Sequence, residues 1–394
     1  MENTQADQNI KKTERFTFTG KGSEYFGIWI VNILLTIVTL GLYSAWAKVR
    51  NKQYFYGNTF LNDSSFEYTA NPVQILKGRL VAVAALVLYQ LSLNFAPTIS
   101  VILLLVFALA IPWVIMKSLA FNARYSQYRN IRFSFNQNTF EAYKVMFLIP
   151  LAGYIGFGLI FTALYFLGKN SSQIAARPVL ITGLAMFFIF FYPFVLFIMA
   201  KFKINNHSYG ESKYNLNIDN ANPYRLIYLK ITGLSLLAAG ILSAVFIYLL
   251  SGSLPTDSLS DLSNTDKAKA LVQSSFLIIP VIIIYITGYA AVIAYVKART
   301  YNLLYSNTSI SKHKLRANMS ARSLTSLYIT NSLGIIFTLG IFTPWALVRT
   351  AKFKAKHTAL QTFGSLDDFV GTQQSEQNPL GEELGEVFDL DIGI

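Results

Sequence analysis

Long apolar stretches constrain the fold of this chain more than any other feature of its sequence. There are eight of them, at residues 26–47, 80–94, 97–116, 145–168, 178–200, 228–251, 274–296 and 324–347. They are almost free of charged side chains. About 20 apolar residues in a helix cross the hydrocarbon core of a bilayer, and a helix that is apolar on all sides is stable only among lipids and other helices. We therefore expect an all-α polytopic membrane protein with six to eight membrane-embedded helical segments.

The composition excludes a soluble globular enzyme. Of the 394 residues, 53% are hydrophobic and 13% are charged, whereas a soluble domain has about 25% charged residues. There is too little polar surface to cover so large a core, and too much apolar sequence for a disordered chain. Cysteine is absent, so disulfides, thiolate metal sites and cysteine nucleophiles are excluded.

The positive charge predicts the orientation in the membrane. The net charge is +13, and 21 basic residues lie in the loops 48–79, 117–144, 201–230 and 297–322. The loops between them contain only four. Because cytoplasmic loops are enriched in lysine and arginine, we expect the four basic loops on the cytoplasmic side. The charge lies close to the membrane in every loop, so we expect no nucleic-acid partner.

An internal repeat relates the two ends of the apolar region. Residues 15–61 recur at 314–360 with a constant offset of 299, and ten of the 19 positions in 32–50 are identical in the second copy. Shared Asn, Thr-Leu-Gly, Trp and Arg in register are typical of a true repeat. Trp46 and Trp345 are equivalent and are expected at the membrane interface.

The repeat leaves two topologies open. If residues 26–47 and 324–347 each cross once, the copies run in opposite directions, as in many transporters. If both re-enter and return, their flanking basic segments stay on one side. Gly41 and Gly340 could then make the turn, because glycine permits backbone conformations that other residues avoid.

A weaker pattern runs through the basic loops. In each, a tyrosine follows a lysine after eight residues, and alternating triplets at 16–18, 66–68, 133–135, 216–218 and 315–317 have strand character. The triplets predict either a small juxtamembrane sheet or amphipathic surface contacts. The lysines and tyrosines are expected at headgroup level, where they would anchor the interface or bind anionic lipid. These anchors are Lys48, Tyr56, Lys117, Tyr125, Lys201, Tyr209, Lys297 and Tyr305.

Asn32 and Asn331 are equivalent polar residues inside apolar stretches. They could form hydrogen bonds between helices, or they could line a substrate path at the repeat interface together with Gly41 and Gly340. The second interpretation predicts a transporter or channel for a small neutral or amphiphilic solute. The alternative is a lipid-associated or scaffolding protein whose basic loops bind anionic lipid or a protein partner.

No residue pattern indicates catalysis. His207, His313 and His357 follow apolar stretches without metal-ligand spacing, and we interpret them as solvated loop residues. Nucleotide, hydrolase and metalloprotease motifs are absent. We expect no enzyme activity, catalytic residue, metal or cofactor.

The chain divides into three parts. An N-terminal segment (1–25), cytoplasmic or external, precedes a polytopic domain (26–360) and an acidic tail (361–394). The tail contains eight carboxylates and no lysine or arginine, and its residues 371–377 have the composition of a linker. It is either free or docked on the basic loops.

The segments 16–22, 39–50 and 54–59, with the Trp-Ala-Lys-Val-Arg block at 46–50, resemble the YjgN family of bacterial inner-membrane proteins. The second copy and the acidic end are similar too. The resemblance implies a multi-pass protein of the bacterial inner membrane with no assigned biochemical function. It implies no catalytic or binding residues.

Overall fold

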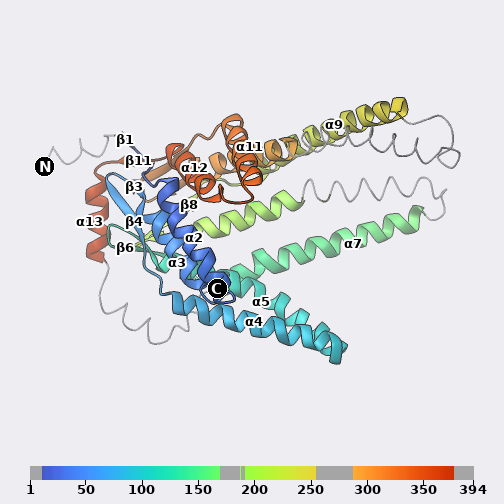
Figure 1. The fold of residues 1–394 in the computed structure, drawn as a ribbon, viewed down its shortest axis with the longest axis horizontal. Helices are drawn as coiled ribbons and strands as arrows, with labels where there is room; N and C mark the ends of the chain where they lie inside the picture. Colours follow the sequence, from blue (N-terminus) through green and yellow to red (C-terminus); the bar gives the residue numbers. More distant parts are fainter. Residues whose placement is uncertain (1–10, 169–186, 188–190, 254–286, 377–394) are drawn as a thin grey trace.

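Short strands from the whole length of the chain form one sheet. The computed structural model describes residues 11–168, 187, 191–253 and 287–376 (Figure 1). Its strands are β1 (Lys11–Arg15), β2 (Thr17–Phe18), β3 (Thr59–Leu61), β4 (Ser64–Tyr68), β5 (Ser126–Tyr128), β6 (Ile131–Phe135), β7 (His207–Tyr209), β8 (Ser212–Leu216), β9 (Thr308–Ile310), β10 (His313–Ala317) and β11 (Thr358–Phe363). The sheet contains eleven strands in the order β1-β11-β10-β9-β8-β7-β6-β5-β4-β3-β2, and its strand pairs are antiparallel.

The sheet is nearly closed into a barrel. Its two end strands, β1 and β2, are separated in the chain only by Phe16. β1 pairs with β11 and β2 pairs with β3. The Phe16 amide also donates to the Thr358 carbonyl at 3.2 Å, which continues the β1–β11 ladder to this residue. The continuous segment 11–18 therefore contributes both end strands of the sheet and connects its two edges.

Four β-hairpins in the barrel have the same dimensions. Each has a three-residue strand, two turn residues and a five-residue strand. Asn62 and Asp63 in the first turn, and Arg129 and Asn130 in the second, have positive φ angles between 46° and 63°. Positive φ at both central residues is the geometry of type I′ turns, which match the twist of antiparallel strands.

Helices leave the sheet and return to it between these hairpins. The long ones are α2 (Gly22–Val38), α3 (Ser44–Gly57), α4 (Pro72–Phe95), α5 (Pro97–Arg124), α7 (Ile149–Gly168), α9 (Asn222–Ser253), α11 (Ala321–Phe337) and α12 (Thr343–Lys356). Residues 191–205 and 287–306 are also helical. The short helix α6 (Thr139–Tyr143) and the π-helical turn η2 (Lys144–Leu148) lead into α7. In Figure 1, α4, α7 and α9 extend from the barrel in one general direction.

The barrel interior is filled by two sets of equivalent side chains. One set consists of the last residues of the three-residue strands, Leu61, Tyr128, Tyr209 and Ile310, together with Leu360 inside β11. The second set packs against it and consists of Phe16, Phe66, Phe133, Tyr214 and Leu315. Aromatic rings touch within and between the sets, with centroids 4.7 Å apart for Phe66 and Tyr128. The core is therefore a continuous apolar layer.

Helix α13 (Leu366–Glu376) covers one end of this core (Figure 1). Leu366 and Val370 are buried in the same cluster, and Phe369 packs against it. Arg129 forms an ion pair with Asp367 at 2.5 Å, and the Ser212 amide donates to Gln373 Oε1 at 3.0 Å. The predicted linker from Gly371 is thus helical up to residue 376. The acidic end, 377–394, lies outside the described residues, as does the segment 1–10.

The prediction of an all-α fold is wrong. The chain contains an eleven-stranded sheet, and three helices in the described residues are long and apolar enough to cross a membrane, instead of six to eight. These helices span Pro72–Phe95, Pro97–Arg124 and Thr139–Ala163. About half of each of the predicted stretches 178–200 and 274–296 lies outside the described residues. Four of the five alternating triplets lie in strands of this sheet or directly beside them, so the triplets do mark strands, but the sheet has eleven strands and is not the small one expected.

Residues 26–47 and 324–347 each turn back toward the sheet. α2 and α3 pack on each other, and the strands that flank them, β2 and β3, are paired. α11 and α12 follow the same course between β10 and β11, which are also paired. At an offset of 299, the bounds of α2 and α3 coincide with those of α11 and α12 residue for residue. The structure therefore has the returning course and not the single crossing.

Candidate functional site

The equivalent asparagines lie inside these two helical hairpins. Asn32 is buried on α2, and its Nδ2 donates to Asn51 Oδ1 on α3 at 3.0 Å. Asn331 is buried on α11, and its Nδ2 donates to the Ala346 carbonyl at 3.2 Å and to Thr350 Oγ1 at 3.3 Å on α12. Both asparagines thus connect the two helices of their own hairpin.

Gly41 and Gly340 lie in the turns at the tips of these hairpins. Their φ angles are 94° and 95°, which strongly favours glycine. The preceding leucines, Leu40 and Leu339, also have positive φ and are 95% and 94% exposed. The Thr-Leu-Gly motif therefore builds a sharp turn that presents a leucine at its end.

The tip of the first hairpin leaves no backbone donor unpaired. The amides of residues 39–42 and 44 donate to backbone carbonyls at 2.7–3.1 Å. The Tyr43 amide donates to Thr39 Oγ1 at 2.9 Å, and Thr39 Oγ1 donates to the Leu35 carbonyl. The second tip repeats every one of these bonds 299 residues later. Irregular backbone tolerates an apolar medium only when its polar groups are satisfied internally, and both tips meet that condition for their donors.

The two tryptophans pack at the base of these tips. Trp46 stacks on Tyr43, with ring centroids 6.1 Å apart. Trp345 packs on Phe26 of α2, with centroids 5.2 Å apart. It also covers Gly22, where an added Cβ would meet the indole Cδ1 at 2.2 Å. Trp345 thus joins the second hairpin to the first, in agreement with the extensive contact between α2 and α12.

The four predicted lysines lie on the helices that lead into the short strands, 6 to 11 residues before them. Lys48 and Lys117 are half-buried on α3 and α5. Lys201 lies in the helix 191–205, and its Nζ donates to the Ile218 carbonyl at 3.1 Å. Lys297 is exposed in the helix 287–306, with its Nζ 5.3 Å from the ring centroid of Tyr328.

The four tyrosines do not occupy equivalent positions. Tyr56 and Tyr305 lie three residues before a short strand, and Tyr125 lies one residue before. Tyr209 ends β7, is buried inside the barrel, and donates to the Tyr128 carbonyl at 3.1 Å. Burial raises the pKa of Tyr209 well above its usual range. The eight-residue spacing from lysine therefore combines three surface-proximal tyrosines with one core residue.

Sequence reasoning missed a compact cationic cluster beside Lys48. Lys52 of α3 contacts Asn122 Oδ1 of α5 and lies 4.4 Å from the ring centroid of Tyr68. Arg79 of α4 contacts Ser44 Oγ of α3. Burial, with a smaller contribution from the neighbouring charge of Lys48, lowers the pKa of Lys52 to about 8. Arg79 comes from another helix, so it is the packing of α3 against α4 that brings it to the face of α3 that carries Lys48 and Lys52.

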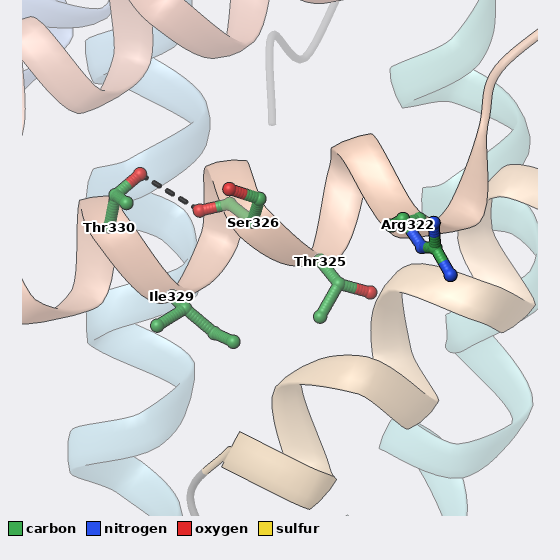
Figure 2. A pocket seen from close by; sticks show the side chains of 5 residues that line it. All are labelled: Arg322, Thr325, Ser326, Ile329 and Thr330. Atoms are coloured by element: carbon green, nitrogen blue, oxygen red, sulfur yellow. Dashed lines mark hydrogen bonds between the residues drawn. The ribbon is translucent and has the colours of Figure 1, made fainter.

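A groove of about 410 Å³ runs along α11. Figure 2 shows that its lining combines one guanidinium, three hydroxyl side chains and one apolar side chain, from Arg322, Thr325, Ser326, Ile329 and Thr330. Thr330 Oγ1 donates to the Ser326 carbonyl at 2.9 Å and accepts from Arg349 Nη2 at 2.9 Å. All of these lining residues come from one helix, so the groove is an open surface strip and not an enclosed site.

The interpretation of the histidines as solvated loop residues is wrong for His313. This side chain is fully buried in β10, and its Nδ1 accepts from the Phe363 amide at 3.2 Å. His207 and His357 are partly buried, and the Nδ1 atoms lie 2.6 and 2.8 Å from the carbonyl oxygens of Lys203 and Phe353. Within the described residues, no three acidic, histidine or cysteine side chains gather in a way that could hold a metal ion.

Comparison with known proteins places the chain in a family. Residues 13–387 match a family described as bacterial protein of unknown function (DUF898). The chain belongs to this family. The match to DUF898 begins within β1 and extends beyond α13, so the barrel, the helical hairpins and the α13 cap all belong to the part of the chain that defines the family.

Relatives of this DUF898 chain include three proteins named "Inner membrane protein YjgN". Those of Escherichia coli O157:H7 and strain K12 are 27% and 26% identical, over 93% of this chain and 92% of theirs. That of Salmonella typhimurium is 25% identical over 92% of this chain and 91% of its own length. No solved structure matches the chain.

Proposed function

We propose that the chain is a lipid-associated inner-membrane protein whose barrel lies on the cytoplasmic face and whose helical hairpins enter the bilayer. The observation that carries this proposal is that each of the four helices leading into a short strand carries a lysine 6 to 11 residues before that strand. The inner-membrane relatives support the location. The basic residues of these hairpins support the orientation, because lysine and arginine accumulate on the cytoplasmic side.

Helix lengths indicate two depths of insertion. The apolar run in α4 from Leu80 to Phe95 is about 24 Å long at 1.5 Å per residue. It approaches the thickness of the hydrocarbon core, about 30 Å. From Lys48 to Gly41 the first hairpin extends only about 10 Å beyond its cation. Since one leaflet contributes about 15 Å of hydrocarbon, this tip and its equivalent are expected to remain in the cytoplasmic leaflet.

Exposed apolar side chains at the tips support their placement in the cytoplasmic leaflet. Val38, Leu40, Phe337 and Leu339 are each at least 77% exposed. Isolated in water, such clustered apolar side chains would be unfavourable. Together with the paired backbone donors, they indicate contact with acyl chains. The two hairpins would thus act as shallow membrane anchors beside the longer spans.

The contacts favour this proposal over a solute transporter. The transporter hypothesis used Asn32 and Asn331 as polar groups along a path. Both side chains instead donate to the partner helix of their own hairpin. The longest apolar helices are also poorly packed, with 11%, 17% and 0% of their most apolar windows buried inside the described structure. Lipid contact fits these exposed faces.

The test compares two sets of lysine-to-glutamine substitutions in the full chain. The first set neutralises the membrane-proximal lysines Lys48, Lys117, Lys201 and Lys297. The matched control removes the same charge from exposed strand or turn lysines of the barrel, Lys11, Lys213, Lys312 and Lys314. We expect the first set to lose most of the anionic phospholipid that copurifies with the protein, measured by mass spectrometry, and the control to retain it. Equal retention in both, with equal membrane insertion, would refute the proposal.

A further inference from the structure

Three cations converge where the first two helical hairpins meet. Lys48 and Lys52 belong to α3, and Arg79 belongs to α4. Ser44, Lys48 and Lys52 lie one turn apart on the same face of α3, and Arg79 contacts Ser44. The charge of Arg79 adds to burial in lowering the pKa of Lys48, and the charge of Lys48 does the same for Lys52. The three side chains are only partly exposed. The protein therefore holds like charges together in a place that water reaches poorly.

No carboxylate compensates for this charge within the part of the chain that the structure describes. The ion pairs found there join Lys12 to Glu14, Lys21 to Glu24 and Arg129 to Asp367. Cations that are half-buried and grouped are normally paired with acids or bind an external anion. The compensating negative charge must then come from outside the described residues.

Neutral polar groups surround the cluster and hold it in place. Asn122 contacts Lys52 through Oδ1, while its Nδ2 donates to the Ser118 carbonyl at 2.6 Å, so the amide orientation is fixed. Tyr68 is 3% exposed and places its ring face 4.4 Å from Lys52 Nζ. The Ser44 hydroxyl contacts Arg79. A guanidinium, two ammonium groups and a hydroxyl are donors suited to the oxygen atoms of a phosphate.

We propose that Lys48, Lys52 and Arg79 form a binding site for a phosphate group at the junction of α3, α4 and α5. The site rests on the proposed lipid association and specifies its ligand chemistry. Arg79 is the last charged residue before the apolar run of α4. A phosphate held there would have acyl chains of its own lipid beside that helix, so a phospholipid headgroup and free phosphate are the two sources to separate.

The experiment titrates the full chain in neutral detergent with three probes. These are inorganic phosphate, dihexanoyl phosphatidylglycerol and dihexanoyl phosphatidylcholine. Binding is followed by calorimetry and by protection of Lys52 from an amine-reactive reagent, read by mass spectrometry. Arg79→Gln and Lys52→Gln remove site charges, and Lys77→Gln removes an exposed charge from the same helix as Arg79.

We expect phosphatidylglycerol to protect Lys52 and to bind at least tenfold more weakly to Arg79→Gln and Lys52→Gln, with less than a twofold change in Lys77→Gln. Arg79→Lys should recover part of the affinity, which shows that loss is not due to misfolding. If inorganic phosphate protects Lys52 equally well, the free anion is the ligand; if only the lipid does, the headgroup is.

Two results would overturn the site. Phosphatidylcholine binding as tightly as phosphatidylglycerol would show that net anionic charge is not recognised. Equal affinities of Arg79→Gln and Lys77→Gln for phosphatidylglycerol would show that the cluster is not used. In the second case, loss of copurified lipid in the four-lysine variant would still support general lipid association, so the two proposals can fail separately.

Discussion

Acidification should weaken the barrel through His313. The imidazole is fully buried beneath α13, with its ring centroid 4.6 Å from that of Phe369. Its Nδ1 accepts a hydrogen bond from the Phe363 amide of β11 at 3.2 Å, which requires an unprotonated Nδ1. Burial, with a smaller contribution from the charge of Lys312, lowers its pKa to about 4. The folded barrel therefore favours the neutral imidazole.

The sign and magnitude follow from the pKa difference between the folded and unfolded states. The unfolded chain binds the proton near pH 6.5, whereas the folded chain resists it until about pH 4. The contribution to stability is complete above pH 6.5 and is lost as the pH falls toward 4. A difference of this size corresponds to about 3 kcal/mol at 1.36 kcal/mol per pH unit.

Urea unfolding of the detergent-solubilised protein at pH 7.0 and 4.5 measures this loss. His313→Gln keeps an acceptor for the Phe363 amide but does not titrate. We expect the wild type to lose more unfolding free energy between the two pH values than His313→Gln does, by about 2–3 kcal/mol. The same pH dependence in both proteins would show that His313 is not held neutral, and the reasoning would fail.

Three further substitutions test the hairpin tips and the α13 cap. Thr338→Val should lower the free energy of unfolding by about 1–3 kcal/mol because it leaves the Phe342 amide unpaired. Thr338→Ser keeps the hydroxyl acceptor and should change the free energy of unfolding little. In this cysteine-free chain, a fluorophore on Leu40→Cys should emit as in an apolar medium and resist aqueous quenchers in vesicles; efficient quenching would contradict insertion of the tip. Gln373→Met removes the acceptor for the Ser212 amide, and proteolysis after residue 376 should accelerate; an unchanged rate would show that this bond does not hold α13.

The helical hairpins were more accessible from the sequence than the barrel. Hydropathy located α4 and α5, and the shared Thr-Leu-Gly motif identified the turns at Gly41 and Gly340. Single crossing could not be separated from return, because 22 apolar residues fit either course. The pairing of β2 with β3 decides it, and that pairing depends on tertiary structure.

The barrel could not be predicted from the sequence because its strands are short and some of them pair with strands far away in the chain. Strands of two to six residues give almost no periodicity, and β1 pairs with a strand at the other end of the chain. The alternating triplets carried the correct signal at Phe66 and Phe133 but the wrong register at residues 216–218, since Tyr214 is the equivalent core residue. Local pattern alone does not define a register.

The sequence predicted a basic face but not which residues make up the candidate site. Charge counting indicated a basic face, and Lys48 was among the proposed anchors. Lys52 and Arg79 were passed over because their significance depends on α3 packing against α4. Tyr209 matched a spacing pattern yet belongs to the core, since its position relative to β7, and not its distance from Lys201, determines where it points.

Because β1 pairs with β11, the barrel can form completely only after residues 358–363 have been synthesised. β1 is among the first described segments to leave the ribosome, and β11 is among the last. A chain that terminates before residue 358 would keep its hairpins but would leave the backbone groups of β1 and β10 unpaired at two open edges. Such edges recruit other strands or are degraded. Truncated copies should therefore be distinguishable to the cell from finished ones, even when their long apolar helices are complete.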